Sequence, residues 1–244
     1  LYNLEVLMIN YNVLQSLPNY VFSDLHELKE LFISNNNLTR IAQNTLGGFE
    51  KLKKLSLRDN VITSVNKMFS GVVNVEELDL SKNSINSISS DTFKGLTRLK
   101  SLDLSDNLIK SWQVHSFNDL AVLRKLDLSK NRLKGVLSKH HFAGLENLKI
   151  LDLSYNSLCL PASFPEGVFH FLQSLQILHL HHLHALKQNT LILICDTETR
   201  SNFTAAYPDQ ALKDLTNLQT LYIQGVSEHI GPGFQHLTQL QRIQ

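Results

Sequence analysis

Four histidines lie within six positions of the stretch "QILHLHHLHALKQ" at 176–188: His179, His181, His182 and His184. Imidazole nitrogens bind metal ions, and imidazole is the side chain whose charge changes most readily near neutral pH. Three interpretations follow: a metal site, a pH-responsive contact with Asp152 or with a ligand, or solvent-exposed residues of an irregular element. A metal site is the least favoured because no ligand geometry can be read from the spacing, and we expect no metal and no cofactor.

The elements that must position these histidines belong to an internal repeat. "LDLSKN" occurs at 78–83 and 126–131, "LDLSDN" at 102–107 and "LDLSYN" at 151–156. The wider pattern LxxLxLxxNxL recurs about every 24 residues, with starts at Leu4, Leu28, Leu52, Val75, Leu99, Leu123 and Leu148, degraded copies at Leu175 and Leu218, and a partial copy at Leu240. The short LxL predicts a strand with both leucines on one face. One repeat cannot bury these side chains alone, so neighbouring repeats must stack in parallel.

A column of asparagines follows the predicted strands. Its members are Asn12, Asn36, Asn60, Asn83, Asn107, Asn131 and Asn156. A carboxamide is both a donor and an acceptor, so it can satisfy buried backbone groups of adjacent repeats in the turn after each strand. We therefore interpret this column as structural.

These columns resemble those of the leucine-rich repeat. The resemblance covers essentially the whole chain and implies an α/β solenoid, a curved horseshoe with a parallel β-sheet on its concave face and about nine to ten repeats of ~24 residues. We expect one solenoid domain, with regular repeats over 1–174 and irregular repeats over 175–244. The chain lacks the cysteine-rich terminal caps of such proteins, which predicts an interior portion of a longer solenoid.

Function is expected in the variable positions, because the fold alone does not specify it. The residue between the two strand leucines points outward on the predicted concave face. These residues are Met8, Phe32, Ser56, Asp79, Asp103, Asp127, Asp152, His179 and Tyr222. Four stacked aspartates should raise one another's pKa unless cations compensate. Lysines and arginines before and after the strands, such as Lys100 and Lys130, are the candidate compensators. The strip is either a solvated mixed-charge face or a site for a protein or a cation.

The histidines lie where the regular pattern ends. His179 and His181 are predicted to point to the concave face, His182 follows, and Leu183 occupies the Asn position. From their position we select as candidate ligand-binding residues Asp127, Asp152, His179, His181, His182 and Tyr222.

An insertion is predicted at about 184–211, and such segments of solenoids are often functional. It contains Cys195, which could pair with Cys159 in an oxidising compartment; the alternative is two buried thiols. The sequons at Asn37 and Asn202 favour the secretory route, with glycosylation at both sites.

Composition and motifs narrow the functional classes. The net charge of +1 gives no reason to expect generic binding to nucleic acids or membrane surfaces. No apolar run is long enough for a transmembrane helix. The sequence has no Gly-rich phosphate loop, no GxSxG and no HExxH motif, and we expect no enzymatic activity.

The repeated LxxLDLSxN, the phenylalanines before the repeats, the sequons, the broken repeat and the insertion together resemble a Toll-like receptor ectodomain. The resemblance implies an innate immune receptor that binds a microbial protein, lipid or nucleic acid and forms homo- or heterodimers. It also implies a single-pass membrane protein, anchored by a segment outside this chain, whose ectodomain faces the cell exterior or an endosomal lumen. The alternative is an extracellular adhesion, matrix or guidance protein, although the broken repeats after residue 175 argue against it.

Overall fold

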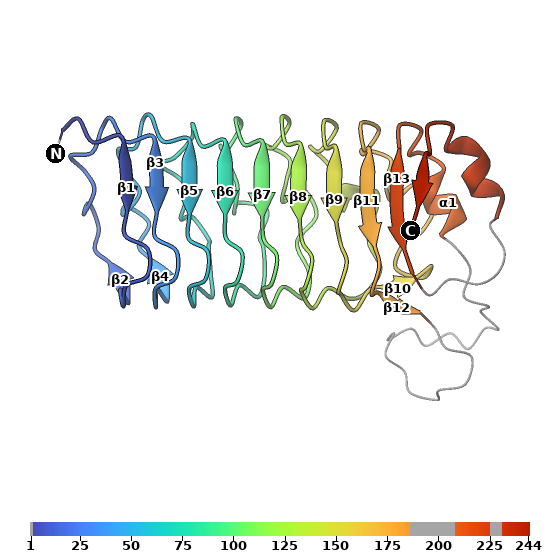
Figure 1. Cartoon of the computed structure of the whole chain (residues 1–244), viewed down its shortest axis with the longest axis horizontal. Coiled ribbons are helices and arrows are strands. Elements are labelled where there is room, and N and C mark those ends of the chain that lie inside the picture. Colours follow the sequence, from blue (N-terminus) through green and yellow to red (C-terminus); the bar gives the residue numbers. More distant parts are fainter. Residues whose placement is uncertain (1, 186–207, 225–230) are drawn as a thin grey trace.

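The chain forms a stack of rungs, each of which adds one strand to a long parallel sheet (Figure 1). The computed structural model describes residues 2–185, 208–224 and 231–244. The sheet has ten strands that lie side by side in chain order. They are β1 (Val6–Met8), β3 (Glu30–Phe32), β5 (Lys54–Ser56), β6 (Glu77–Asp79), β7 (Ser101–Asp103), β8 (Lys125–Asp127), β9 (Ile150–Asp152), β11 (Ile177–Leu180), β13 (Thr220–Ile223) and β14 (Arg242–Ile243).

The strand register aligns the repeats position by position. Leu102 of β7 pairs with Leu78 of β6 and Leu126 of β8, and all three are buried. Because side chains alternate along a strand, the flanking residues point away from the core, onto the concave face. Every residue of the predicted outward column is in register with its neighbour, from Met8 with Phe32 to His179 with Tyr222. The predicted solenoid with a parallel sheet is thus confirmed.

The core is continuous along the stack. Its phenylalanines pack ring to ring between rungs, with centroids 5.9 Å apart for Phe69 and Phe93 and 6.0 Å apart for Phe93 and Phe117. Both pairs are stacked within 20° of parallel, at interplanar angles of 19° and 18°. Each rung therefore buries its apolar side chains only against its two neighbours, as a solenoid requires.

The asparagine column joins the rungs through buried hydrogen bonds. Asn107 is typical: its Nδ2 donates to the carbonyls of Leu80, Leu104 and Ser105, and its Oδ1 accepts from the backbone N–H of Ile85. The residue before each asparagine has a left-handed backbone, with φ between 53° and 57°. These residues are Tyr11, Asn35, Asp59, Lys82, Asp106, Lys130 and Tyr155.

The connections between the main strands contain little regular helix. In the described parts of the chain the helical elements are η1 (Lys139–His141), α1 (Asp209–Leu212) and η2 (Pro232–His236), and none is long and apolar enough to cross a membrane. The apolar residues of these connections lie three apart, and their backbone forms single turns with bonds over three residues rather than an α-helix. Leu96 N–H donates to the carbonyl of Phe93, and Leu99 N–H to that of Leu96. Two small parallel sheets flank the stack: β2 (Ser16–Leu17) with β4 (Arg40–Ile41), and β10 (Cys159–Leu160) with β12 (His184–Ala185).

The main sheet continues across the predicted boundary at 174/175, since β11 pairs with both β9 and β13. Most of the predicted insertion at 184–211 lies outside the described residues. The division into regular and irregular repeats stays a prediction.

Candidate functional site

The aspartate column on the concave face comprises Asp79, Asp103, Asp127 and Asp152, which are in register on adjacent strands. Each aspartate has a serine two residues later, and that serine donates both its backbone N–H and its hydroxyl to the aspartate Oδ1. At Asp127 these donors lie at 3.0 and 2.7 Å, both from Ser129. Every carboxylate of the column is therefore held by its own rung.

The lysines do not compensate the aspartates as predicted. In the described residues they pair with glutamates of adjacent rungs: Lys53 and Lys100 both contact Glu76, and Lys54 contacts Glu77. The reason is reach, because the glutamates lie beside the lysines at the start of the strands, whereas the aspartates lie at their ends.

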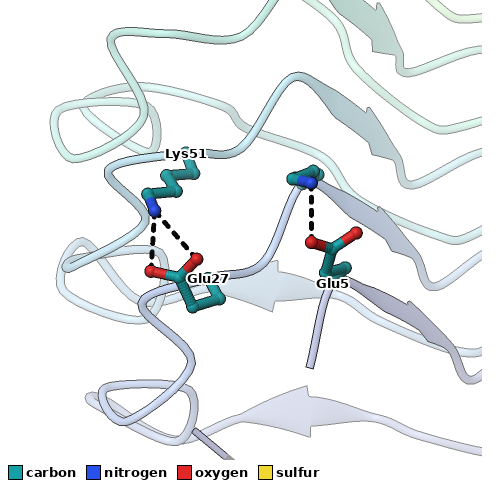
Figure 2. A network of polar contacts seen from close by, with 4 residues as sticks. Glu5, Glu27 and Lys51 are labelled. Carbon is teal, nitrogen blue, oxygen red and sulfur yellow. Dashed lines mark hydrogen bonds and ion pairs between the residues drawn. The ribbon is translucent and has the colours of Figure 1, made fainter. Parts of the chain in front are cut away.

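The same pattern of glutamate–lysine pairs extends to the first rungs (Figure 2). Lys51 binds both carboxylate oxygens of Glu27, and Lys29 binds Glu5 at 2.6 Å. The hydrogen bond from Lys51 lowers the pKa of Glu27, and the bond to Glu27 raises that of Lys51. These pairs are solvent-exposed, so they contribute little to stability.

Mutual repulsion in the aspartate column is visible at Asp127. Burial is the main cause that raises the pKa of this carboxyl, and the charges of Asp103 and Asp152 raise it further. The hydrogen bonds from Ser129 act in the opposite direction. At Asp127 the serine therefore offsets only part of the effect of burial and of the neighbouring charges.

The aspartate column ends at β11, where histidines stand at the positions of both the aspartate and its serine. His179 aligns with Asp152 in the strand register. Counting onward, His181 takes the place of Ser154, and His182 takes the place of Tyr155 with the same left-handed backbone, at φ 52°. Leu183 then occupies the Asn position and is buried, without a side-chain group that could bond the backbone there. The rung keeps its backbone geometry while its surface chemistry changes from acidic to aromatic.

The side chains of Tyr155, His179, His181, His182 and Tyr222 form one aromatic cluster. The ring of His182 stacks on Tyr155 with centroids 4.2 Å apart, and His179 stacks on Tyr222 at 4.2 Å with the planes only 3° from parallel. His181 lies between the two stacks, 5.4 Å from Tyr155 and 5.7 Å from His179 in edge-on contacts. The cluster therefore joins rungs β9, β11 and β13 into one surface.

His181 is the partly buried centre of this cluster. Burial is the main cause that lowers the pKa of its imidazole, and the neighbouring His179 and His182 lower it further, whereas Asp152 raises it. Its Nδ1 is buried without a hydrogen-bond partner in the described structure. Asp152 turns its Oδ1 to Ser154 at 2.5 Å, and no ion pair between a histidine and an aspartate occurs in the part of the chain that is described. The predicted contact of a histidine with Asp152 is thus an electrostatic one only.

Sequence reasoning missed Tyr155, which belongs to the cluster and is 44% exposed. Lys130 was considered only as a partner of the aspartates, whereas its Nζ lies 5.9 Å from the centre of the Tyr155 ring. A signal existed: both residues stand directly before the asparagine of their repeats, in a column as regular as that of the aspartates. The candidates Asp127, Asp152, His179, His181, His182 and Tyr222 all lie on β8, β9, β11 and β13 or just after β11.

The remaining site predictions lie outside this surface. Cys159 is buried in β10 and is disulfide-bonded, whereas Cys195 lies outside the described residues, so their pairing stays a prediction. Asn37 is exposed, and Asn202 lies outside the described residues, so glycosylation stays a prediction as well. Among the described residues no three His, Cys, Asp or Glu side chains are arranged to hold a metal ion.

Comparison with known proteins agrees with this architecture. Residues 1–38, 27–85, 73–133 and 123–184 match the sequence model of the leucine rich repeat. No curated protein matches the chain. Among solved structures, the crystal structure of the TLR13–ssRNA13 complex is similar, with a TM-score of 0.80 and 29% sequence identity. The match covers 99% of this chain and 36% of that one, so the chain spans about a third of that receptor. The chain therefore belongs to the leucine-rich repeat family, and over nearly its whole length it has the fold of the repeats of a Toll-like receptor.

Proposed function

We propose that this chain is a ligand-binding part of a Toll-like receptor ectodomain and that its ligand is a single-stranded nucleic acid, with bases stacked on the aromatic cluster. The observation that carries the proposal is the exposed Tyr155–His182 stack at the end of the aspartate column. Unpaired bases stack on aromatic side chains, including histidine, and this stacking tolerates any sequence.

The charges around the cluster support a path for the ligand. Phosphates laid along the aspartate column would be repelled, so the backbone must approach the cluster from the β13 side, away from Asp152. Lys130 follows β8 and supplies a cation at the opposite edge of the cluster, beside Tyr155. The similar receptor was crystallised with an RNA, which supports the same ligand class here.

A phosphate near His181 would favour its protonated form and oppose the effect of burial on its pKa. We therefore expect binding to strengthen as the pH falls towards that of an endosome. The proposal includes a microbial source of the ligand, receptor dimerisation, membrane anchoring through a segment outside this chain, and a lumenal ectodomain.

The test measures binding of fluorescent single-stranded RNA, single-stranded DNA, the matching duplexes, a lipopeptide and a flagellin-like protein to the intact protein. Two pH values are compared, about 5.5 and about 7.4. Replacing Tyr155 with alanine is expected to weaken single-strand binding by about 5- to 150-fold, which corresponds to the loss of one stacked base.

Tyr11→Ala is the matched control, because Tyr11 occupies the same repeat position, has the same left-handed backbone and is exposed. It is expected to leave binding unchanged. Equal effects of the two substitutions, binding of duplex as tight as single strand, or binding only of the lipopeptide or protein would overturn the assignment of the ligand.

A further inference from the structure

A cavity of about 360 Å³ opens in the connections between strands, outside the sheet that carries the aromatic cluster. Its walls include Lys139 and His140 of η1, in the connection from β8 to β9, and Glu166, Gly167 and His170, in the connection from β10 to β11. This volume is at the lower end of the range for small-molecule sites. The cavity can therefore take a small group but not an extended chain.

Two imidazoles, those of His140 and His170, line this cavity, and that of His115 packs against His140 from the preceding rung. The ring of His115 lies 5.3 Å from that of His140, and the rings of His140 and His170 both contact Phe171, at 6.4 and 5.3 Å. The backbone N–H of His115 donates to the carbonyl of His140 at 2.9 Å, which holds the first two rungs in place. The spacing of the rungs thus sets the spacing of the imidazoles.

The charges of the cavity favour an anion. Glu166 is the carboxylate in the wall, and the ammonium of Lys213 forms a hydrogen-bonded ion pair with it, which raises the pKa of Lys213. Lys139 forms no ion pair within the described residues, so its charge is left for a ligand. His141, on the same turn, accepts a hydrogen bond from the backbone N–H of Ser138, and burial lowers its pKa, which disfavours a charge on its imidazole.

We propose that this cavity binds a small anion that carries one phosphate or sulfate group, held by the ammonium of Lys139 and the imidazoles of His140 and His170. Charge-assisted hydrogen bonds from these donors match the oxygens of such a group. Phe171 contacts both imidazoles and so helps to hold them at the cavity. This site is independent of the aromatic cluster and of the ligand proposed for it.

An imidazole attracts an anion more strongly in its charged form, so acid should strengthen binding. The ionisable groups that line the cavity are Lys139, His140, Glu166 and His170, and those that adjoin this lining are His115, His141 and Lys213. Inorganic sulfate is the appropriate first probe, because it remains a dianion across the pH range in which imidazole titrates. We expect sulfate to bind about tenfold more tightly at a pH of about 5.5 than at about 7.4.

The experiment records imidazole NMR signals of the intact protein during titration with sulfate, adenosine 5′-monophosphate and adenosine. The signals of His140 and His170 are expected to shift with sulfate and the monophosphate and to stay unchanged with adenosine. Lys139→Gln, His140→Gln and His170→Gln are expected to weaken sulfate binding, whereas His26→Gln, a control at another exposed histidine, is not.

The three substituted side chains are exposed, so unchanged melting temperatures are expected to show that the variants fold. If one variant does not fold, the changes in the imidazole NMR signals of the unaltered protein decide whether the proposal holds. Adenosine that binds as well as the monophosphate, sulfate that shifts the control His26 as much as His140, or variants that bind sulfate like the unaltered protein would each overturn the proposal.

Discussion

Replacing Asn107 with alanine is expected to leave one buried backbone N–H without a partner. Asn107 is 4% exposed and makes four hydrogen bonds to the backbone. The carbonyl of Leu80 keeps a bond from Asn83, that of Leu104 one from Asn131, and that of Ser105 one from Lys82. Within the described residues the N–H of Ile85 bonds only the Oδ1 of Asn107, so it is the group that becomes unsatisfied.

The expected loss follows from this inventory. An unsatisfied buried N–H costs about 1–3 kcal/mol, and the loss of the carboxamide's other bonds adds about 1 kcal/mol net. Asn107→Ala should therefore reduce the free energy of unfolding by about 2–4 kcal/mol. Asn86→Ala removes an exposed asparagine of the preceding repeat, and its effect should stay within about 0.5 kcal/mol.

The assay is unfolding in guanidinium chloride, followed through Trp112, the single tryptophan of the chain, which is 3% exposed. A lower midpoint at unchanged slope is expected. Asn107→Asp tests the donor and acceptor roles of the carboxamide separately. It keeps an oxygen that accepts from Ile85 but places a carboxylate against three carbonyl oxygens. It should be at least as destabilised at neutral pH and recover in acid as the carboxyl protonates. The reasoning is refuted if Asn107→Ala and Asn86→Ala are equally stable, or if Asn107→Asp matches the unaltered protein.

Three further predictions concern the backbone and the two columns of ionisable residues. Gly144→Ala should reduce stability by about 3 kcal/mol or more, because φ is +90° and a Cβ would lie 2.4 Å from the carbonyl oxygen of Phe117. Gly135 has φ +87° but no atom within 4 Å of the position that a Cβ would take, so Gly135→Ala should cost only the left-handed penalty of about 1–2 kcal/mol. Equal midpoints of the two variants in thermal unfolding would contradict this. The pKa of Asp127 is raised in the folded protein, so the unaltered protein loses stability as pH rises from the ordinary pKa of an aspartate to the folded pKa of Asp127. Asp127→Asn should therefore stabilise the protein increasingly from about pH 4 upward. A difference in stability between the two proteins that does not depend on pH would contradict this. Because the pKa of His181 is lowered in the folded protein, the stability that this histidine contributes is present above about pH 6.5 and is lost as pH falls towards the folded pKa. The difference in stability between the unaltered protein and His181→Gln should therefore shrink between about pH 7.5 and pH 5. A constant difference would show that burial does not disfavour the charge of His181.

Much of the candidate site could be predicted from the repeat pattern. Because each strand pairs in parallel with the same position of the next repeat, the alignment of Asp79, Asp103, Asp127 and Asp152 followed from counting along the chain. The alignment of His179 with Asp152 followed in the same way.

Partner choice could not be predicted by counting. The lysines were expected to neutralise the aspartates, but serines two residues away supply their hydrogen bonds and the lysines pair with glutamates. The choice of a hydrogen-bond partner depends on where the end of each side chain lies, within fractions of an ångström. The repeat pattern specifies only the backbone position of each residue. Tyr155 was missed for a related reason, since nothing in its own repeat shows that the next rung will place His182 on its ring at 4.2 Å.

The sequence by itself determined the solenoid, the direction of its strands and the residues that face outward, because a period of about 24 residues with fixed apolar positions has one way to bury them. Only the tertiary structure decided which outward side chains act together. The aromatic cluster on three rungs and the imidazoles around the cavity at η1 come from residues tens of positions apart in the chain. Their contacts exist because stacking brings successive rungs within reach of one another, about 5 Å apart, and side-chain rotamers then select the neighbour.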